Sequence, residues 1–536
     1  MKNLKLLLLS ILMTCGGSGL FAQNTIDCRI SEKEILTPLP AKTPRINGPK
    51  IYGARPARDF LYRIPCQGER PIHFTIGKLP ETLTIDSKGI ITGMSPQKKG
   101  TYRMIITATN KYGTTTRDFK IVVGDKLCLT PPTGWNSWGG QMINVSDKDM
   151  RKAADVFDHR GLADVGFQYL GIDDCWMRLN QDMFDNQSEG NKKKHRSYDY
   201  EGTGTIGVVR DNKGSILPNG KFPDMKAMTD YFHALGLKVG IYSGPGAKTC
   251  QRWEASYGHE RADADQYAKW GFDLLKYDMC SGSEVYQIMK DRISGFSQKD
   301  FWRPMAEYIQ VQDRDMVFNL CQYGKEDPWT WAPSLNIQSW RTGGDLNHHV
   351  DQYFKEALRI AIDLRAYSKP GQWNDPDFMY IHRIKNVGNM NAPSVEIALN
   401  TNQRYQYVTL WSIICAPFFF STDITAIDDF TIGLLSNPEV MNINQDERGH
   451  VAEVFRNENN EVVMVKNLDN GNKVLAIFNR DHQNEKIIKL NWNEINLWGV
   501  QEVFDVWREK DLGQIKEAIQ VRLSPDGVAL FTLKKP

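Results

Sequence analysis

The chain has 536 residues, of which 41% are hydrophobic and 24% charged, so it is a globular protein longer than one typical domain. Its formal net charge of +2 lacks the excess that would indicate nucleic acid or an anionic membrane as a partner. The 14 Trp, 20 Tyr and 23 Phe suit either large cores or a site that stacks on sugar rings, and composition does not choose between them.

Residues 1–22 have the pattern of a signal peptide. Lysines precede the short apolar run Leu6–Met13, and small residues lead to a cleavage position after Ala22. The run is far shorter than the roughly 20 apolar residues that span a bilayer, so no integral membrane segment is expected after signal removal. We expect a secreted, periplasmic protein. The alternative is a surface lipoprotein anchored through Cys15, which Thr14 disfavours because lipoprotein cleavage boxes usually have a smaller residue there.

Residues 45–125 contain short β-rich runs separated by turn signals. The runs lie at 71–76, 83–85, 89–93, 102–110 and 119–123. Closely spaced short strands predict a β-sandwich. The region has no cluster of ionisable groups suited to catalysis, so we interpret it as a spacer or packing module, with glycan binding as the alternative.

Residues 126–445 alternate apolar runs with amphipathic helical stretches. Eight such runs over roughly 300 residues predict a (β/α)8 TIM barrel. A doubly wound open sheet is the rival fold, but the first run lacks the Gly-rich phosphate turn typical of that fold. The runs are Gly134–Trp138, Phe167–Trp176, Leu237–Ser243, Phe272–Cys280, Met316–Tyr323, Leu335–Trp340, Gly371–Asp377 and Ile413–Phe420.

Two further segments complete the chain. Gly, Asn and charged residues at 180–219 interrupt the pattern after the second run, which predicts a long loop at the rim of the barrel mouth. Residues 446–536 contain alternating runs at 462–465, 474–478 and 528–531, which predict a small antiparallel β-sandwich.

Polar residues crowd the ends of the apolar runs, where a (β/α)8 barrel builds its active site. A single carboxylate there is usually a helix cap or an ion-pair partner. Six carboxylates on one face are different, because burying so much like charge requires cations and a ligand that uses it. The residues are Asp173, Asp174, Lys276, Asp278, Gln322, Arg341, Asp345, Asp375 and Asp377.

Acid–base chemistry on a neutral, hydroxyl-rich substrate fits this set. Glycoside hydrolysis uses two carboxyl groups across the scissile bond, about 5–5.5 Å apart for retention and wider for inversion. Asp278 and Asp345 follow the fourth and sixth runs and can face each other across the barrel mouth. Spacing in sequence does not fix their separation, so both stereochemical outcomes stay open at this point.

No metal and no cofactor are predicted. His348 and His349 form a tempting pair, but adjacent side chains on a helix point in different directions, and no further His or Cys stands at ligand spacing. The turn Ser243–Gly246 lacks the Lys-Ser/Thr ending of a phosphate loop.

A set of motifs carries a family resemblance from about residue 130 to 535. With these motifs in order at the strand ends, the chain resembles the α-galactosidases of glycoside hydrolase family 27. Residues 79–110 separately resemble the immunoglobulin-like modules appended to bacterial glycosidases. The motifs are Thr130–Trp138, Gly171–Trp176, Gly240–Tyr242, Leu274–Cys280 and Gly371–Asp377, extended by Ala416–Phe418 and Asn442–Asp446.

The resemblance implies a role for each matched position. Asp278 matches the nucleophile that forms a glycosyl-enzyme and Asp345 the general acid/base, and the family retains anomeric configuration. The disulfide partners of the family match Cys250 and Cys280. The remaining positions match sugar-binding residues: Lys276 and Arg341 for hydroxyls, Asp173 and Asp174 for the 4- and 6-hydroxyls, Trp138 and Tyr242 as aromatic walls, and Asp377 as a further pocket position.

The chain departs from the family pattern in places. Gln322 stands where many members have the Glu of a Cys-Glu-Trp sequence, so it can hydrogen-bond the sugar 2-hydroxyl but carries no charge. Its length disfavours an N-acetyl group at that carbon. Cys175 has no evident partner in the preceding helix, so the second family disulfide is not expected.

The resemblance predicts an exo-acting enzyme that releases terminal α-linked D-galactose from a glycan. A β-L-arabinopyranosidase is the alternative within the family, since that sugar is galactose without its hydroxymethyl group. The intact Asp173 favours galactose over it. A non-catalytic glycan-binding protein is the alternative from another class, and the joint presence of Asp278, Asp345, Lys276 and Arg341 opposes it.

Overall fold

A (β/α)8 barrel forms the centre of the computed structural model, which describes residues 25–180, 204–346, 349–385 and 393–536. Its eight strands are parallel and follow chain order around the ring. A parallel bridge between Met379 and Phe420 joins the last strand to the segment after the seventh. The strands are β11 (Thr133–Asn136), β12 (Tyr169–Gly171), β13 (Lys238–Ser243), β14 (Leu274–Asp278), β15 (Val317–Cys321), β16 (Ser339–Arg341), β17 (Trp373–Asp375) and β20 (Phe418–Phe420). The predicted barrel is confirmed: six strands lie inside their predicted apolar runs, and β11 and β16 each overlap theirs but extend one residue beyond it, to Thr133 and Arg341.

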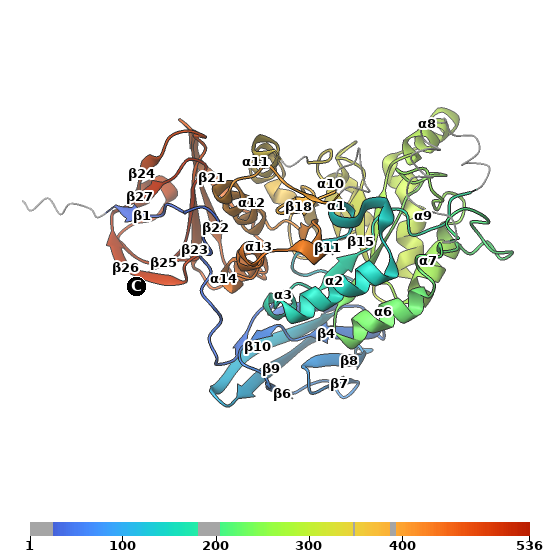
Figure 1. The fold of residues 1–536 in the computed structure, drawn as a ribbon, viewed down its shortest axis with the longest axis horizontal. Coiled ribbons are helices and arrows are strands. Elements are labelled where there is room, and N and C mark those ends of the chain that lie inside the picture. The colour runs from blue at the N-terminus through green and yellow to red at the C-terminus, as the bar shows by residue number, and fades with distance from the viewer. Residues whose placement is uncertain (1–24, 181–203, 347–348, 386–392) are drawn as a thin grey trace, which may run out of the picture.

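Helices surround the ring and bury their apolar faces against it (Figure 1). Ser146 begins α2 by accepting a hydrogen bond from the main-chain N–H of Asp149, as Ser commonly does at this position. The principal helices are α2 (Asp147–His159), α6 (Met225–Ala234), α7 (Glu260–Trp270), α8 (Gly282–Arg292), α9 (Gln298–Gln310), α11 (Val350–Arg359), α12 (Thr401–Ile413), α13 (Asp429–Leu435) and α14 (Pro438–Asn444), with short helices α1 (Trp138–Gln141), α3 (Leu162–Val165) and α10 (Pro328–Trp331).

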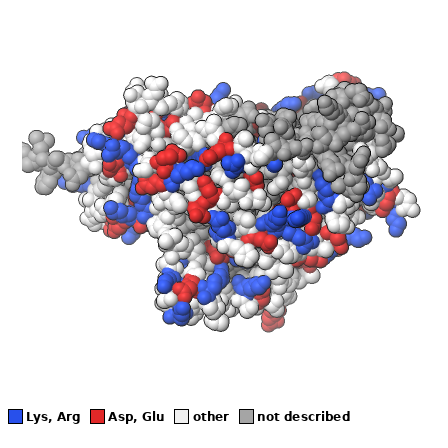
Figure 2. Space-filling view, in the orientation of Figure 1, with Lys and Arg blue, Asp and Glu red and all other residues white. Residues whose placement is uncertain are grey.

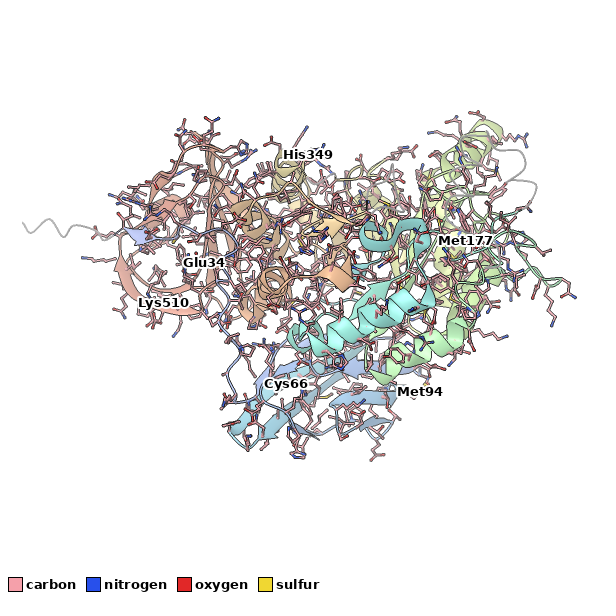
Figure 3. All side chains as sticks on the ribbon, viewed as in Figure 1. Glu34, Cys66, Met94, Met177, His349 and Lys510 are labelled. Atoms are coloured by element: carbon pink, nitrogen blue, oxygen red, sulfur yellow. A yellow bond between two sulfur atoms is a disulfide. The ribbon has the colours of Figure 1, made fainter. Side chains whose placement is uncertain are left out.

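The N-terminal module is a two-sheet sandwich with its own apolar core, as predicted. It lies against α2 and α6 at the amino-terminal side of the barrel strands (Figure 1); Cys66 and Met94 mark it in Figure 3. One sheet has the order β3 (Ile51–Ala54), β10 (Gly113–Val123), β9 (Gly100–Asn110), β6 (His73–Gly77), and the other β4 (Asp59–Arg63), β8 (Ile90–Met94), β7 (Leu83–Ile85).

Partly buried ion pairs attach the module to the barrel. Arg63 lies 2.5 Å from Asp158 at the end of α2 and 3.0 Å from Asp164 in α3, and Arg55 lies 2.6 Å from Asp315 before β15. A cavity of about 590 Å³ remains between the module and the barrel floor. The contacts support the interpretation of the module as a packing element.

The C-terminal part is also a two-sheet β-sandwich, as predicted, with a separate core. The larger sheet has the order β21 (Glu453–Glu458), β22 (Glu461–Asn467), β23 (Lys473–Asn479), β28 (Val528–Lys534), β25 (Val500–Asp505), β26 (Lys510–Lys516). In the smaller sheet, β1 (Ile26–Asp27) pairs with β27 (Ala518–Leu523), which pairs with β24 (Lys486–Asn491). The chain therefore begins, within the described residues, on the C-terminal sandwich and crosses to the module, an arrangement that the sequence did not indicate.

Acidic and basic side chains are interspersed on the face shown in Figure 2. No helix within the described ranges has both the length and the hydrophobicity to cross a bilayer. The proposed signal peptide at 1–22 and most of the predicted rim loop, from 181 to 203, lie outside the described residues. The described end of that loop is tied to the barrel by Arg210, whose guanidinium lies 2.6 Å from both Glu254 and Asp263.

Candidate active site

The barrel topology brings nearly all of the predicted site residues to one face. Asp278 is the last residue of β14 and Arg341 the last of β16, while Lys276 and Tyr242 lie within two residues of the ends of β14 and β13. Five further carboxylates lie at or just beyond strand ends: Asp375 ends β17, and the other four follow their strands by two to four residues. They are Asp173, Asp174, Asp345 and Asp377 together with Asp375. All of these side chains therefore lie at the carboxyl ends of the strands.

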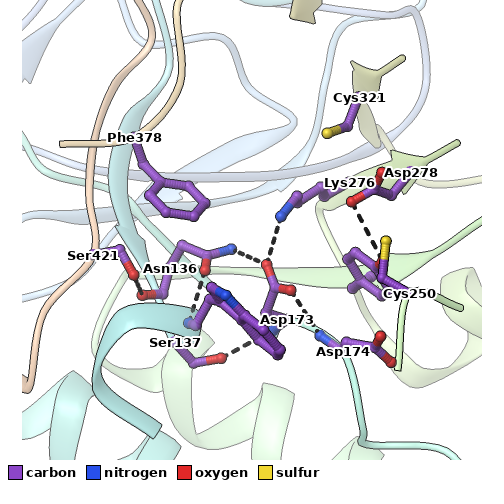
Figure 4. Close-up of polar contacts among 12 residues, drawn as sticks. Asn136, Ser137, Asp173, Asp174, Cys250, Lys276, Asp278, Cys321, Phe378 and Ser421 are labelled. Atoms are coloured by element: carbon purple, nitrogen blue, oxygen red, sulfur yellow. Dashed lines mark hydrogen bonds and ion pairs between the residues drawn. The ribbon is translucent and has the colours of Figure 1, made fainter. Parts of the chain in front are cut away.

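Asp173 is the centre of a buried hydrogen-bond network (Figure 4). Its Oδ2 atom accepts from Lys276 Nζ and from Asn136 Nδ2, each at 2.7 Å. Its Oδ1 atom accepts from the main-chain N–H of Asp174 at 2.9 Å. The Lys276 ammonium also lies 5.2 Å from the ring centres of Tyr242 and Phe378, a favourable cation–π geometry. Asp173 thus has three donors, and one of the roughly four acceptor positions of a carboxylate remains.

Asp278 is buried between two phenols. Tyr323 Oη donates to its Oδ1 atom at 2.7 Å, and Tyr242 Oη donates to its Oδ2 atom at 3.3 Å. Burial raises the pKa of Asp278 above its usual value, although the positive charge of Lys276 and the Tyr323 hydrogen bond act in the opposite direction. The proximity of Asp173 and Asp345 raises the pKa further. A carboxylate so placed has the polar surroundings that a buried nucleophile needs.

Asp345 differs from Asp278 because its side chain is 75% exposed. Arg341, which is almost fully buried, holds it at 3.2 Å and also lies 3.0 Å from the buried Asp377. The second contact fixes the guanidinium, since Asp377 in turn accepts a main-chain hydrogen bond from Leu346 at 2.9 Å. Asp345 is therefore free to meet an incoming group while its neighbours are fixed.

Two of the carboxylates have strongly raised pKa values. Burial raises the pKa of Asp174 to about 7, against hydrogen bonds that include the main-chain N–H of Gln251. Burial likewise raises the pKa of Asp377 to about 7, against the charge of Arg341. Each of these two carboxyl groups is therefore partly protonated near neutral pH, which reduces the negative charge of the cluster. In its protonated form, such a group can donate a hydrogen bond.

The structure contains the disulfide bond between Cys250 and Cys280 that the family resemblance implied. Both sulfur atoms lie within 4.8 Å of the Asp278 carboxylate, but their bond to each other leaves no thiolate to bind a metal. Cys175 is buried and unpaired, as the sequence indicated. His348, half of the histidine pair considered as a metal site, lies outside the described residues.

Gln322 is placed differently from the other predicted site residues. It is fully buried, and its Nε2 atom donates to the main-chain oxygen of Lys325. Its Oε1 atom has no partner among the residues that the structure describes. No contact links it to Asp278, so its assignment to the sugar 2-hydroxyl stays a prediction.

Sequence reasoning overlooked three residues of the site: Asn136, Tyr323 and Phe378. Asn136 lies two residues before Trp138, Tyr323 directly follows Gln322, and Phe378 directly follows Asp377. Their position at or just after a strand end was the signal that could have identified them. It was missed because the search for site residues favoured charged side chains.

Comparisons with known proteins agree with this geometry. A family model described as α-galactosidase A matches residues 188–446, one described as the α-galactosidase C-terminal β-sandwich domain matches 458–533, and an Ig domain model matches 61–124. The chain is 30% identical over 412 residues to an α-galactosidase of Cyamopsis tetragonoloba, covering 76% of this chain and 87% of that protein. It is 32% identical to one of Coffea arabica, covering 77% and 96%.

Solved structures extend the likeness to all three parts. A candidate α-galactosidase of Bacteroides fragilis has a TM-score of 0.78 at 28% identity and covers 93% of this chain and 99% of that chain. A family 27 β-L-arabinopyranosidase of Geobacillus stearothermophilus has a TM-score of 0.62 at 21% identity, covering 76% and 96%. The second likeness concerns the fold alone, and it means that the fold does not distinguish the two sugars.

Proposed function

This chain belongs to glycoside hydrolase family 27, the family of the α-galactosidases, and we propose that it releases terminal α-linked D-galactose from oligo- or polysaccharides by retaining double displacement. The contrast between Asp278 and Asp345 carries the proposal. One carboxylate is buried and held by two phenols, and the other is exposed beside Arg341. Two carboxyl groups in such different surroundings suit a nucleophile and an acid/base.

The proposed reaction has two halves. A carboxylate oxygen of Asp278 attacks the anomeric carbon while the glycosidic bond breaks, and the leaving oxygen takes a proton from Asp345. Asp345 then removes a proton from water, which attacks the same carbon and displaces Asp278. The galactose leaves with its anomeric configuration retained, because the carbon is inverted twice.

Recognition of galactose rests on the network around Asp173. Its remaining acceptor position can take a charge-assisted hydrogen bond from the 6-hydroxyl. β-L-Arabinopyranose lacks this hydroxyl, but three donors to Asp173 would remain in its absence. We therefore propose that the enzyme prefers the α-galactoside by at least about tenfold in kcat/KM and retains some activity on the arabinopyranoside. Parity between the two sugars would favour the arabinopyranosidase instead.

The nucleophile is tested by Asp278→Asn together with three nitrophenyl glycosides: α-galactoside, β-L-arabinopyranoside and α-N-acetylgalactosaminide. The variant should fold and bind galactose but lose at least about a thousandfold in kcat, because an amide cannot form the glycosyl-enzyme. Asp363→Asn, which changes an exposed carboxylate on the helical layer, is the matched control and should behave as wild type. Substantial turnover by Asp278→Asn would refute the assignment.

We further propose export from the cell. The sequence pattern of residues 1–22 supports it, and so does the Cys250–Cys280 disulfide, since such bonds persist in oxidising compartments. The mass of the mature protein tests this proposal. A chain that begins at Gln23 supports export with cleavage after Ala22, whereas a lipid-modified chain that begins at Cys15 supports anchoring to a surface.

A further inference from the structure

Tyr323 lies where the chain turns sharply after β15. Its backbone φ of 65° is in the left-handed region, which an aromatic residue rarely adopts. Gly324 follows with φ of 72°, and a Cβ atom there would meet the main-chain oxygen of Thr342 at 2.1 Å. The turn is therefore fixed by its surroundings, and it holds a strained tyrosine beside the proposed nucleophile.

The Tyr323 hydroxyl makes the shorter of the two phenolic hydrogen bonds to Asp278. It donates to Oδ1 at 2.7 Å, whereas Tyr242 donates to Oδ2 at 3.3 Å and also lies 3.3 Å from the sulfur of Cys280. A short hydrogen bond to an ionised acceptor is stronger than one between neutral groups. Tyr323 is thus the principal neutral donor to this carboxylate.

We propose that Tyr323 is a positioning residue for Asp278 and that its hydroxyl acts mainly in the second half of the reaction, where it stabilises the departing carboxylate. This inference rests on the proposed double displacement. It assigns a task to a residue that neither the family resemblance nor the carboxylate pattern had included.

The negative charge of Asp278 changes between the two halves of the reaction. In the first half, an electron pair of the carboxylate forms the bond to the anomeric carbon, the electrons of the glycosidic bond pass to the leaving oxygen, and that oxygen takes the proton of Asp345. Asp278 becomes a neutral ester, so the hydrogen bond from Tyr323 weakens. In the second half, the electrons of the ester bond return to Asp278 as water attacks, and the hydrogen bond regains its full strength.

The proton of Tyr323 stays on its oxygen throughout. Burial and the neighbouring charge of Asp278 raise the pKa of the phenol above its usual range. The hydroxyl therefore stabilises the carboxylate in both the free enzyme and the transition state in which Asp278 leaves. Removing it should slow the second half while leaving attack by the ionised carboxylate as fast as before or slightly faster.

The same contact affects the ionisation of the free enzyme. The groups that face Asp278 are Lys276 on its own strand, Tyr242 on β13, Asp173 after β12, Cys321 at the end of β15, Tyr323 in the turn after it, and Asp345 after β16. Of these, Lys276 and Tyr323 favour the carboxylate form, and the acidic groups oppose it. Loss of the Tyr323 hydroxyl should therefore raise the pKa of Asp278.

The test is Tyr323→Phe, which keeps the ring, assayed with an activated nitrophenyl α-galactoside so that the first half is fast. We expect kcat and KM to fall together by about tenfold, with kcat/KM on its pH plateau unchanged within about threefold. A burst of nitrophenol close to the enzyme concentration should precede steady state, and quenched enzyme should be heavier by one galactosyl group. The acidic limb of the pH profile of kcat/KM should shift to higher pH by about one unit.

Controls separate this effect from general disturbance. Tyr231→Phe removes another phenol that donates to a carboxylate, that of Asp155 on the outer helices, and should change none of these quantities. Tyr323→Met repeats the test with a flexible side chain if the phenylalanine variant is unstable. Equal losses in kcat and kcat/KM, or a limb that does not move, would overturn the inference. If Asp278→Asn is inactive while Tyr323→Phe matches wild type, only this inference fails; if Asp278→Asn is active, the proposed function itself fails.

Discussion

Replacement of Lys276 by Met tests how the buried charges of the site depend on one another. Lys276 is the only cation within hydrogen-bond distance of Asp173 among the described residues; the Asp173 side chain is almost fully buried and that of Lys276 is 15% exposed. Removing one partner of a buried pair costs about 3–5 kcal/mol, because the other charge is left without compensation. If the barrel unfolds as one unit, this corresponds to a fall of about 4–8 °C in Tm.

The pKa of Lys276 determines how the loss of stability in Lys276→Met depends on pH. Burial alone would lower the pKa of Lys276, but the charge and hydrogen bond of Asp173 outweigh it and raise the pKa above the usual lysine value. A group with a raised folded-state pKa contributes its full stability below its unfolded pKa and loses it only as pH rises through the folded value. The difference in Tm between wild type and Lys276→Met should therefore stay constant between about pH 6 and pH 9.

The variant should also change the pH profile of activity. Lys276 is the first of the groups that hold down the pKa of Asp278, so its loss should move the acidic limb of kcat/KM up by about one pH unit or more. Calorimetry and initial rates on nitrophenyl α-galactoside measure the two effects, and Lys290→Met, which removes an exposed ion pair with Glu326, is the control. An unchanged Tm together with an unchanged limb would refute the electrostatic account of the site.

Two other changes test separate parts of the molecule. Asp345→Ala should reduce kcat/KM about a hundredfold or more for glycosides with poor leaving groups but less than about tenfold for activated aryl galactosides, and added azide should yield a galactosyl azide of retained configuration. Arg63→Ala should lower the free energy of unfolding by about 1–3 kcal/mol without changing KM, because it removes the arginine partner of Asp158 at the module interface and leaves Asp164 with Arg70 alone. Denaturant titration measures the free energy of unfolding of Arg63→Ala. The control Lys99→Ala, which removes an exposed ion pair, should leave that free energy unchanged.

The fold could be predicted because apolar runs and amphipathic helices alternate along the chain. Each run contains or overlaps its strand, but the runs are longer than the strands; Phe167–Trp176, for example, contains only β12 (Tyr169–Gly171). Residues beyond the strand, such as Asp173 and Asp174, are buried and carry site groups without belonging to the sheet. Hydrophobicity therefore located the elements and overstated their length.

Other features could not be predicted from local sequence. The strand β1 (Ile26–Asp27) has two residues and no periodicity, and its pairing with β27 depends on where the two sandwiches place their ends. The orientation of Gln322 is likewise set by a main-chain oxygen of its own turn. The Tyr323 contact crosses from one strand to the next and appears only when the ring of strands closes.

The excess of carboxylates over cations in the site has a physical explanation in the proposed substrate. A carboxylate only accepts hydrogen bonds, and each sugar hydroxyl can donate one. Without substrate, Asp173 and Asp174 take donors from the main chain, from Lys276 and from Asn136. Burial shifts the pKa of Asp174 and of Asp377 toward protonation, which limits the repulsion that the five buried carboxylates of the site would create. A neutral ligand rich in hydroxyls would supply further donors without adding negative charge, whereas a phosphate or a uronic acid would add charge where the site already has too much.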